Sequence, residues 1–279
     1  MARRREGSAA PKRKPAGERE VDEIEQRSSP PTPIIYETVR RMGDEEMARP
    51  AISLWWSGIA AGMSISFSLL AQAILQTHLP DTVWRPLVTS LGYTVGFLMV
   101  VLSRQQLFTE NTLTAVLPVM SAFSREMLWK LLRLWAIVLL ANLVGTLIAA
   151  TFCTFTPVLT PELRTGMLEI SRQITEHTWS ATFFQAVTAG FLMAAMVWLM
   201  PGATSAQFHV VVVITYLIAA GGFVHIVAGS MEAFMLLLGG EIGMPFLLGE
   251  FFLPVLLGNI VGGTALFGLL AYAQVMKEI

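Results

Sequence analysis

Residues 177–231 contain no Asp, Glu, Lys or Arg, a run of 55 residues without a formal charge. About 20 apolar residues cross a bilayer core about 30 Å thick, so this run is too long for one helix and must be divided. Pro201-Gly202 marks one division and Gly221-Gly222 a second. Only 14% of the whole chain is charged and 54% is hydrophobic, which is too apolar for an ordinary soluble domain. The chain is therefore predicted to be an all-α polytopic membrane protein.

Dividing the other apolar stretches in the same way predicts six transmembrane helices, of which the second and fifth are broken. Residues 86–103 and 111–124 are each marginal or too short to span alone, and one discontinuous helix explains them better than two spans. The predicted spans are 51–78, 86–124 with a break at 104–110, 134–154, 179–200, a fifth that starts near 207 and breaks at Gly221-Gly222, and 251–275.

The two breaks belong to an internal repeat. Leu107-Phe108-Thr109 at the first break and Gly222-Phe223-Val224-His225 at the second are each followed 33 or 34 residues later by Asn-(Leu/Ile)-Val-Gly, at Asn142 and Asn259. The offset between halves is 116 residues for Thr109 and His225 and 117 for the two asparagines. Two three-helix repeats of this kind must run in opposite senses through the membrane. Polar groups at paired breaks indicate a permeation site near the bilayer midplane, and hence a channel or transporter.

The distribution of charged residues along the chain predicts the nature and the side of the remaining segments. Residues 1–49 hold 11 of the 19 Lys and Arg residues, and residues 1–33 are predicted to form a disordered cytoplasmic tail. Residues 34–49 are predicted to form a short interfacial helix that leads into a six-helix channel domain at 50–279. Seven basic residues flank the inner span ends against three in the outer loops, which predicts an inner-membrane protein with both termini in the cytoplasm.

His225 is the leading candidate pore residue, because ionisable groups at membrane depth are functional by default. Gly222 and Gly229 on either side are predicted to let the backbone leave helical geometry there. Thr109 is predicted to bond one nitrogen of the imidazole, fix the tautomer and leave the other nitrogen facing a permeant. The alternative is a neutral histidine bonded to a neighbouring carbonyl.

Apolar and amide residues near the breaks are candidates for shaping the pore. Leu107, Phe108 and Phe223 are predicted to form hydrophobic constrictions, with simple core packing as the alternative. Asn142 and Asn259 are predicted to support the pore by bonding the backbone groups that the broken helices free, since an unpaired amide at that depth is costly.

Three charges lie close to the breaks, and each is a candidate gate, proton relay or counter-charge: Arg104, Glu110 and Glu232. Glu232 follows His225 by seven residues and shares its face if the segment between them is helical. Each charge could equally extend to the interface or pair within the protein. No cofactor or metal site is predicted, since one cysteine, Cys153, and scattered histidines give no ligand set. Ser230 is not a helical neighbour of His225, which argues against an intramembrane enzyme.

Over about residues 34–276 the chain resembles the formate/nitrite transporter family. The motifs that carry the resemblance are Leu107-Phe108-Thr109, Asn142-Leu-Val-Gly145, Gly222-Phe223-x-His225 with Ala228, and Gly258-Asn259-Ile-Val-Gly-Gly263. The resemblance implies an aquaporin-like protomer in a homopentamer, one pore per protomer and small monovalent anions as substrates. It also implies that Thr109 and His225 face each other between two hydrophobic slits. Thr178 and Gln207 stand where the family often has lysine.

Together with the resemblance, these observations predict a channel for a small monovalent anion or its conjugate acid, proton-coupled through His225. Its assembly as a pentamer is implied by the resemblance alone. Its expected partners are that substrate, protons and the lipid bilayer, with no nucleic acid. Two alternatives stay open. One is a pore for a neutral small solute, and the other is a non-conducting membrane scaffold or sensor that uses its N-terminal tail to bind a partner.

Overall fold

The computed structural model describes residues 30–278, which are helical throughout with no strand in that range. The predicted tail lies almost wholly outside the described residues, and the first described helix begins at Thr32. The elements are α2 (Thr32–Ala48), α3 (Ala51–Ile65), α4 (Phe67–His78), α5 (Arg85–Leu102), α6 (Phe108–Thr114), α7 (Val116–Ser121), α8 (Arg125–Phe155), α9 (Pro161–Arg172), η1 (Gln173–Thr175), α10 (Trp179–Leu199), η2 (Met200–Gly202), α11 (Gln207–Ala220), α12 (Ile226–Leu238), the π-helical η3 (Phe246–Phe252), α13 (Leu253–Ile260), the π-helical η4 (Val261–Gly268) and α14 (Leu269–Val275).

Five helical stretches within the described residues are long and apolar enough to cross a membrane: 51–78, 85–102, 125–155, 179–202 and 246–275. The predicted fifth span consists of two shorter apolar helices, α11 and α12, on either side of its break. The all-helical membrane fold is thus confirmed, whereas the count of six spans stays a prediction.

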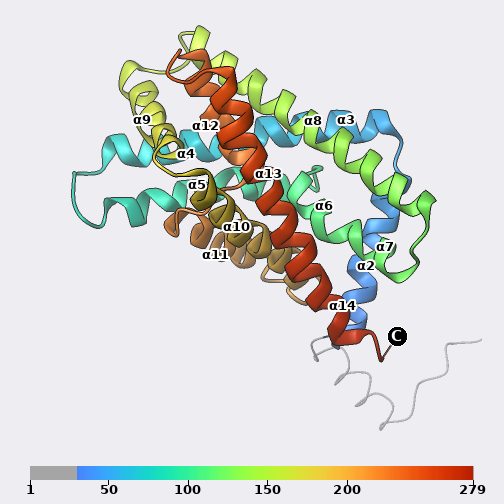
Figure 1. The fold of residues 1–279 in the computed structure, drawn as a ribbon. Helices are drawn as coiled ribbons and strands as arrows, with labels where there is room; N and C mark the ends of the chain where they lie inside the picture. The colour runs from blue at the N-terminus through green and yellow to red at the C-terminus, as the bar shows by residue number, and fades with distance from the viewer. Residues whose placement is uncertain (1–29, 279) are drawn as a thin grey trace, which may run out of the picture.

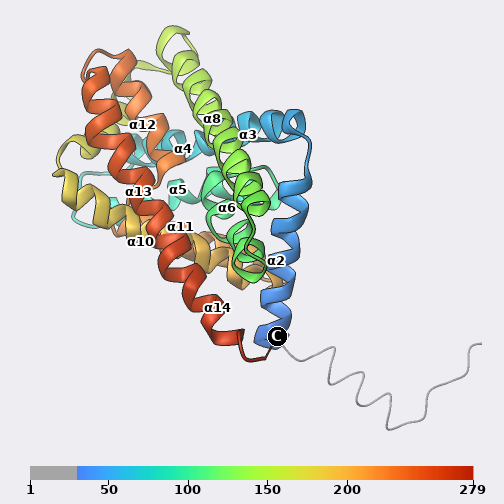
Figure 2. The same ribbon diagram turned by 45° about the vertical axis from the view of Figure 1, so that its right-hand side comes forward.

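The first and last helices of the described chain lie together. Helices α2 and α14 pack side by side at one end of the molecule, next to the C-terminus, while α9 lies at the opposite end (Figures 1 and 2). The long helix α8 crosses α3, and the α13–η4 helix crosses α10 (Figure 1). That both termini lie in the cytoplasm stays a prediction.

Small residues make both crossings close, as the sequence indicates. A Cβ on Gly62 of α3 or on Gly145 of α8 would overlap the backbone of the other helix. The equivalent crossing between α10 and the last helix uses Gly190 and Gly262, where a Cβ would meet the backbone around Asn259 and Val187. Both crossings bring an asparagine-bearing helix against the first helix of its own repeat.

The two asparagines hold the breaks in the same way. Asn142 Oδ1 accepts from the Phe108 N–H at 2.9 Å, and its Nδ2 donates to the carbonyls of Gly58 and Gln106, both at 2.9 Å. In the second half Asn259 Oδ1 accepts from the Ile226 N–H at 2.8 Å, and its Nδ2 donates to the carbonyls of Ala186, at 2.8 Å, and Val224, at 3.1 Å. These bonds are the ones predicted for the asparagines.

The same bonds correct the predicted register of the repeat. Because each asparagine binds the first helical N–H after a break, the residue equivalent to His225 is Leu107, and both have extended backbones, with φ −109° and −111°. Thr109 lies two residues further on, in the first turn of α6 and not in the break. The same register matches Gly222, with φ 64°, to Arg104, which is the only non-glycine residue of the described chain with positive φ, at 53°.

The connection after α8 contains a helix, α9, for which the sequence predicted no element. α9 starts after Thr160, whose side chain caps the Leu163 N–H, and Pro161 takes the first helical position. The helix packs against α4 and α12. α8 also begins nine residues before the predicted span, because a hydropathy argument leaves out its polar first turn. The last helix begins five residues before its own predicted span, which starts after the charge of Glu250.

Candidate functional site

The two halves of the protein meet at a hydrogen bond between Thr109 of α6 and His225, the N-cap residue of α12. Thr109 Oγ1 and His225 Nε2 are 2.6 Å apart, and both side chains are buried. The structure therefore brings together the two residues that the sequence singled out from 116 positions apart. Their contact joins α6 to α12 through a buried polar pair.

The second nitrogen of the imidazole is also occupied. The Ala228 N–H donates to His225 Nδ1 at 3.2 Å and so caps α12. The hydrogen-bond pattern assigns the proton of the neutral ring to Nε2, which donates to Thr109 Oγ1. This corrects the prediction that one nitrogen faces a permeant. A proton on Nδ1 would point at the Ala228 N–H, and the positive end of the α12 dipole also disfavours an imidazolium there.

Aromatic residues of α5 surround the imidazole. Phe97 packs edge to face against His225 with ring centroids 5.1 Å apart, and Tyr93 packs on Phe97 at 5.0 Å. Phe97 and Leu107 are completely buried. Sequence reasoning missed Tyr93 and Phe97, although their spacing of four residues places two aromatic rings on one helix face, which was the available signal.

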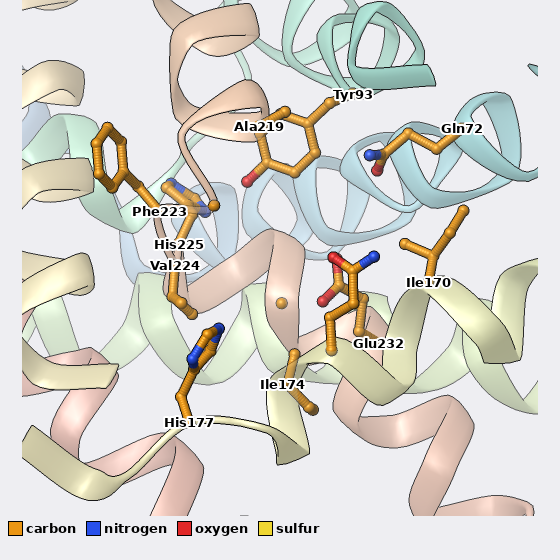
Figure 3. A pocket seen from close by; sticks show the side chains of 13 residues that line it. Gln72, Tyr93, Ile170, Ile174, His177, Ala219, Phe223, Val224, His225 and Glu232 are labelled. Carbon is orange, nitrogen blue, oxygen red and sulfur yellow. The ribbon is translucent and has the colours of Figure 1, made fainter. Parts of the chain in front are cut away.

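A cavity of about 90 Å³ leads to His225 from the end of the molecule where α9 lies (Figure 3). Figure 3 shows Tyr93 and Gln72 along one side of it and Glu232 with Ile174 along the other. His177 lies at its edge and is exposed. The cavity joins residues from six helices and two connecting segments, namely Gln72, Tyr93, Ile170, Gln173, Ile174, His177, Ala219, Gly222, Phe223, Val224, His225, Gly229 and Glu232.

The other predicted pore residues divide between cavity and core. Phe223 and Glu232 line the cavity, and Glu232 shares the His225 face because α12 is helical between them. Phe108 packs against Trp135 of α8 with ring centroids 5.8 Å apart, which is the core-packing alternative. Gly229 lies inside α12 and not at the break, where a Cβ would meet the Phe251 ring, so its role is close packing. Arg104 is exposed and does not line the cavity.

Thr178, at a position where the family often has lysine, caps α10 instead: its Oγ1 accepts from the Ala181 N–H at 3.3 Å. No cluster of three or more His, Cys, Asp or Glu suited to a metal ion occurs between residues 30 and 278.

Two carboxyl groups, Glu46 of α2 and Glu110 of α6, belong to helices that pack against each other away from the cavity. Glu46 accepts a hydrogen bond of 2.5 Å from Thr114 Oγ1, and Glu110 of α6 has a buried Oε1 without a hydrogen-bond partner among the described residues. Burial raises the pKa of Glu46 to about 7, against the lowering effect of the Thr114 hydroxyl. Sequence reasoning missed Glu46, because only tertiary packing of α2 on α6 distinguishes it from its acidic neighbours.

Glu46→Gln is expected to stabilise the protein at pH 8.5 and to leave stability unchanged at pH 4. A carboxyl with a raised native pKa costs stability as pH rises from its unfolded value of 4.5 through about 7, and at 1.36 kcal/mol per unit this amounts to about 3 kcal/mol at most. The measurement is thermal unfolding in detergent at both pH values. Glu45→Gln, at the exposed neighbour, is the control and should change neither value. Equal effects of Glu46→Gln at both pH values would contradict this assignment.

Comparison with known proteins gives one family. The model of the family described as "Formate/nitrite transporter" matches residues 33–273. The inner membrane protein YfdC of Escherichia coli is 42% identical over 245 residues, covering 88% of this chain and 79% of that protein. The formate channel FocA of Haemophilus influenzae is 27% identical over 246 residues, covering 79% of this chain and 85% of that protein.

Two solved structures share the fold. One, described as a pentameric formate channel with formate bound, has a TM-score of 0.68 and 21% identity and covers 81% of this chain and 98% of its own. The other, described as an FNT family ion channel, has a TM-score of 0.72 and 20% identity and covers 87% of this chain and 98% of its own.

Proposed function

This chain belongs to the formate/nitrite transporter family, and from that premise we propose that it forms a membrane channel for a small monovalent anion of the formate or nitrite kind, or for its conjugate acid. The observation that carries the proposal is the buried hydrogen bond between Thr109 and His225 at the inner end of a cavity. A polar pair at the meeting point of two broken helices gives a solute one hydrogen-bonding step inside an apolar path.

His225 and Thr109 divide the work in this proposal. With Nε2 as a donor to Thr109 Oγ1, the Thr109 hydroxyl proton is free to point at a passing oxygen atom. Phe97 and Leu107 beside the pair keep hydrated ions out, because a hydrated ion must shed water to pass apolar side chains. A small weak acid fits this path better than a hydrated anion, and flux is therefore expected to rise as pH falls.

Proton coupling through His225 itself has a clear structural requirement. An imidazolium needs a proton on Nδ1, which displaces the Ala228 N–H cap. In the relay that follows, Nε2–H passes its proton to Thr109 Oγ1 while the Thr109 hydroxyl proton passes to the anion, and a neutral ring protonated on Nδ1 remains. We propose that His225 acts mainly as a hydrogen-bond donor and performs this relay only when an anion next to it offsets the cost.

Assembly and topology follow the relatives. We propose a homopentamer with one pore in each protomer, six spans per protomer and both termini in the cytoplasm of a bacterium. The pentamer is supported by the printed description of one structural relative, the membrane by the name of the Escherichia coli relative and the common side of the termini by the packing of α2 against α14.

A neutral-solute pore is the second candidate, and one observation favours it. Among residues 30–278, no Lys or Arg lines the cavity, so no basic side chain of the described chain attracts an anion there. Measurement of electric current distinguishes the two candidates. Current on addition of substrate means net charge movement, whereas swelling of proteoliposomes without current means neutral or electroneutral passage.

Uptake by proteoliposomes tests the proposal. With formate, nitrite, acetate and hydrosulfide as probes at pH 5 and pH 7.5, we expect uptake of at least one above that of empty liposomes, rising about tenfold or more at pH 5 because the neutral acid becomes more abundant. Absence of uptake of all four at both pH values would contradict a channel for small monoanions or their acids.

A further inference from the structure

We propose that Glu232 is the proton-exchanging group of the cavity, and that its carboxylic acid protonates an entering monoanion before the substrate reaches Thr109 and His225. The inference deepens the proposed function and rests on it. It assigns the proton to a residue other than the histidine at the centre of the path.

Glu232 is placed for this role by α12. It follows His225 by two helical turns, about 10 Å along the axis, and both side chains line the same cavity. Figure 3 shows the Glu232 side chain pointing into the space that Tyr93 and Gln72 border from the other side. A substrate that enters from the α9 end therefore passes the carboxyl before it reaches the imidazole.

The carboxyl of Glu232 is half-buried, and no structural interaction fixes its protonation state. No ion pair or hydrogen bond joins it to another side chain or backbone group of residues 30–278. An acid that served only packing would be paired or fully exposed to solvent. A carboxyl that stands free in a cavity can bind and release a proton without breaking the fold.

Neighbouring charges leave Glu232 free. Tyr93, His177 and His225 are the other titratable side chains that line the cavity. On α9, Arg172 pairs with Glu241 and Glu169 lies toward Gln76 of α4. His78 of α4 bonds a carbonyl of its own helix. The remaining titratable groups on elements packed against α12 do not line the cavity: Glu162 and Arg164 on α9, Glu110 on α6, Cys153 on α8, the basic and acidic residues in the first third of α8, and Glu250 in η3.

His225 is the less suitable proton donor. Both of its nitrogens are engaged, one by the Ala228 N–H and one by Thr109. No cation lines the cavity to hold an anion in its charged form. An anion that enters the apolar path must therefore be neutralised, and Glu232 is the cavity-lining carboxylic acid of the described chain.

The step is a simple proton exchange. The O–H bond of the Glu232 carboxyl breaks and an O–H bond forms on the anion, so that Glu232 becomes a carboxylate and the substrate its neutral acid. The neutral acid moves on to Thr109, and the carboxylate takes a proton from the solution at the mouth of the cavity, where His177 is exposed. No electron transfer is involved.

Uptake of formate at constant total concentration, measured at pH 5 and pH 7.5, tests the proposal. Solution formic acid falls roughly 300-fold between these pH values. Wild-type uptake is expected to fall much less, because Glu232 protonates formate in the cavity. In Glu232→Gln uptake at pH 7.5 should fall by about tenfold, while uptake at pH 5 changes by less than about twofold. Glu232→Asp should restore the wild-type profile, and Glu169→Gln, at an exposed acid of α9, should leave it unchanged.

The outcomes separate this inference from the proposed function. Wild-type uptake with the same pH profile in Glu232→Gln would overturn the role of Glu232 alone. If the glutamine variant does not fold, wild-type uptake that follows solution formic acid over the full 300-fold range also overturns it. Absence of wild-type uptake of all four probes would overturn the proposed function and this inference with it.

Discussion

Replacing His225 by Phe is expected to reduce uptake by about tenfold or more, while the oligomer stays intact. The part of the pH dependence of uptake that arises from His225 should disappear. A phenyl ring fits beside Phe97, but it neither donates to Thr109 Oγ1 nor accepts from the Ala228 N–H. The lost cap costs about 1 kcal/mol, which a folded channel can tolerate. The measurement is proteoliposome uptake at pH 5 and pH 7.5, with size-exclusion chromatography of both proteins.

Three further variants separate chemistry from structure. His225→Asn keeps a side chain that caps helices well but removes the imidazole, so it should fold normally and still lose uptake. Thr109→Val removes the hydroxyl at nearly constant shape and should resemble His225→Phe. His209→Phe, the same change at an exposed histidine that does not line the cavity, should leave uptake near the wild-type value. An unchanged rate and pH profile in His225→Phe would rule out the proposed role of this residue.

Replacing Asn259 by Leu is expected to cost the largest amount of stability of any change considered, about 3–5 kcal/mol. The substitution leaves the Ile226 N–H and the carbonyls of Ala186 and Val224 without their partner, in a region from which water is largely excluded. The break in the fifth span would lose its fixed geometry, and with it the position of His225. Thermal unfolding in detergent and the yield of monodisperse protein measure the effect.

Thr264→Val provides the matched control for Asn259→Leu. Thr264 lies five residues further along the same helix, and its Oγ1 donates one bond of 2.6 Å to the Thr112 carbonyl. Loss of one bond should cost about 1 kcal/mol. Asn142→Leu should behave like Asn259→Leu, because the two asparagines make equivalent bonds. A cost below about 1 kcal/mol for either asparagine would contradict the supporting role.

The sequence predicted the breaks well because local chemistry marks them. Uncharged runs set the helices, and paired glycine or loop positions set the interruptions. The register between halves was wrong by two residues, since Thr109 and His225 look like partners in the sequence although the helix starts match Leu107 with His225. The reason is that Arg104 adopts the left-handed backbone conformation that Gly222 adopts in the second half. The first half therefore lacks the glycine that would have marked the equivalent position in the sequence.

The cavity was beyond prediction from the sequence. Its lining comes from α4, α5, α9, η1, α11 and α12 and the segments beside them, and no local pattern links Gln72, Tyr93 or Gln173 to His225. The N-terminus of α9 is marked in the sequence by Thr160-Pro161, a helix-capping residue followed by proline. A hydropathy argument missed the helix because it carries several charged residues. Glu46 likewise gains its special environment only from the packing of α2 on α6.

By itself the sequence determined that this chain is an all-helical membrane protein with two broken helices, and it pointed to Thr109, His225, Asn142 and Asn259. It could do so because the bilayer imposes length, charge and backbone hydrogen-bonding rules that each segment must satisfy on its own. Only the tertiary structure decided that both nitrogens of His225 are hydrogen-bonded, which residues line the cavity and that Glu232 has no partner in it among residues 30–278. Those properties depend on contacts between segments far apart in the chain, and no local rule encodes them.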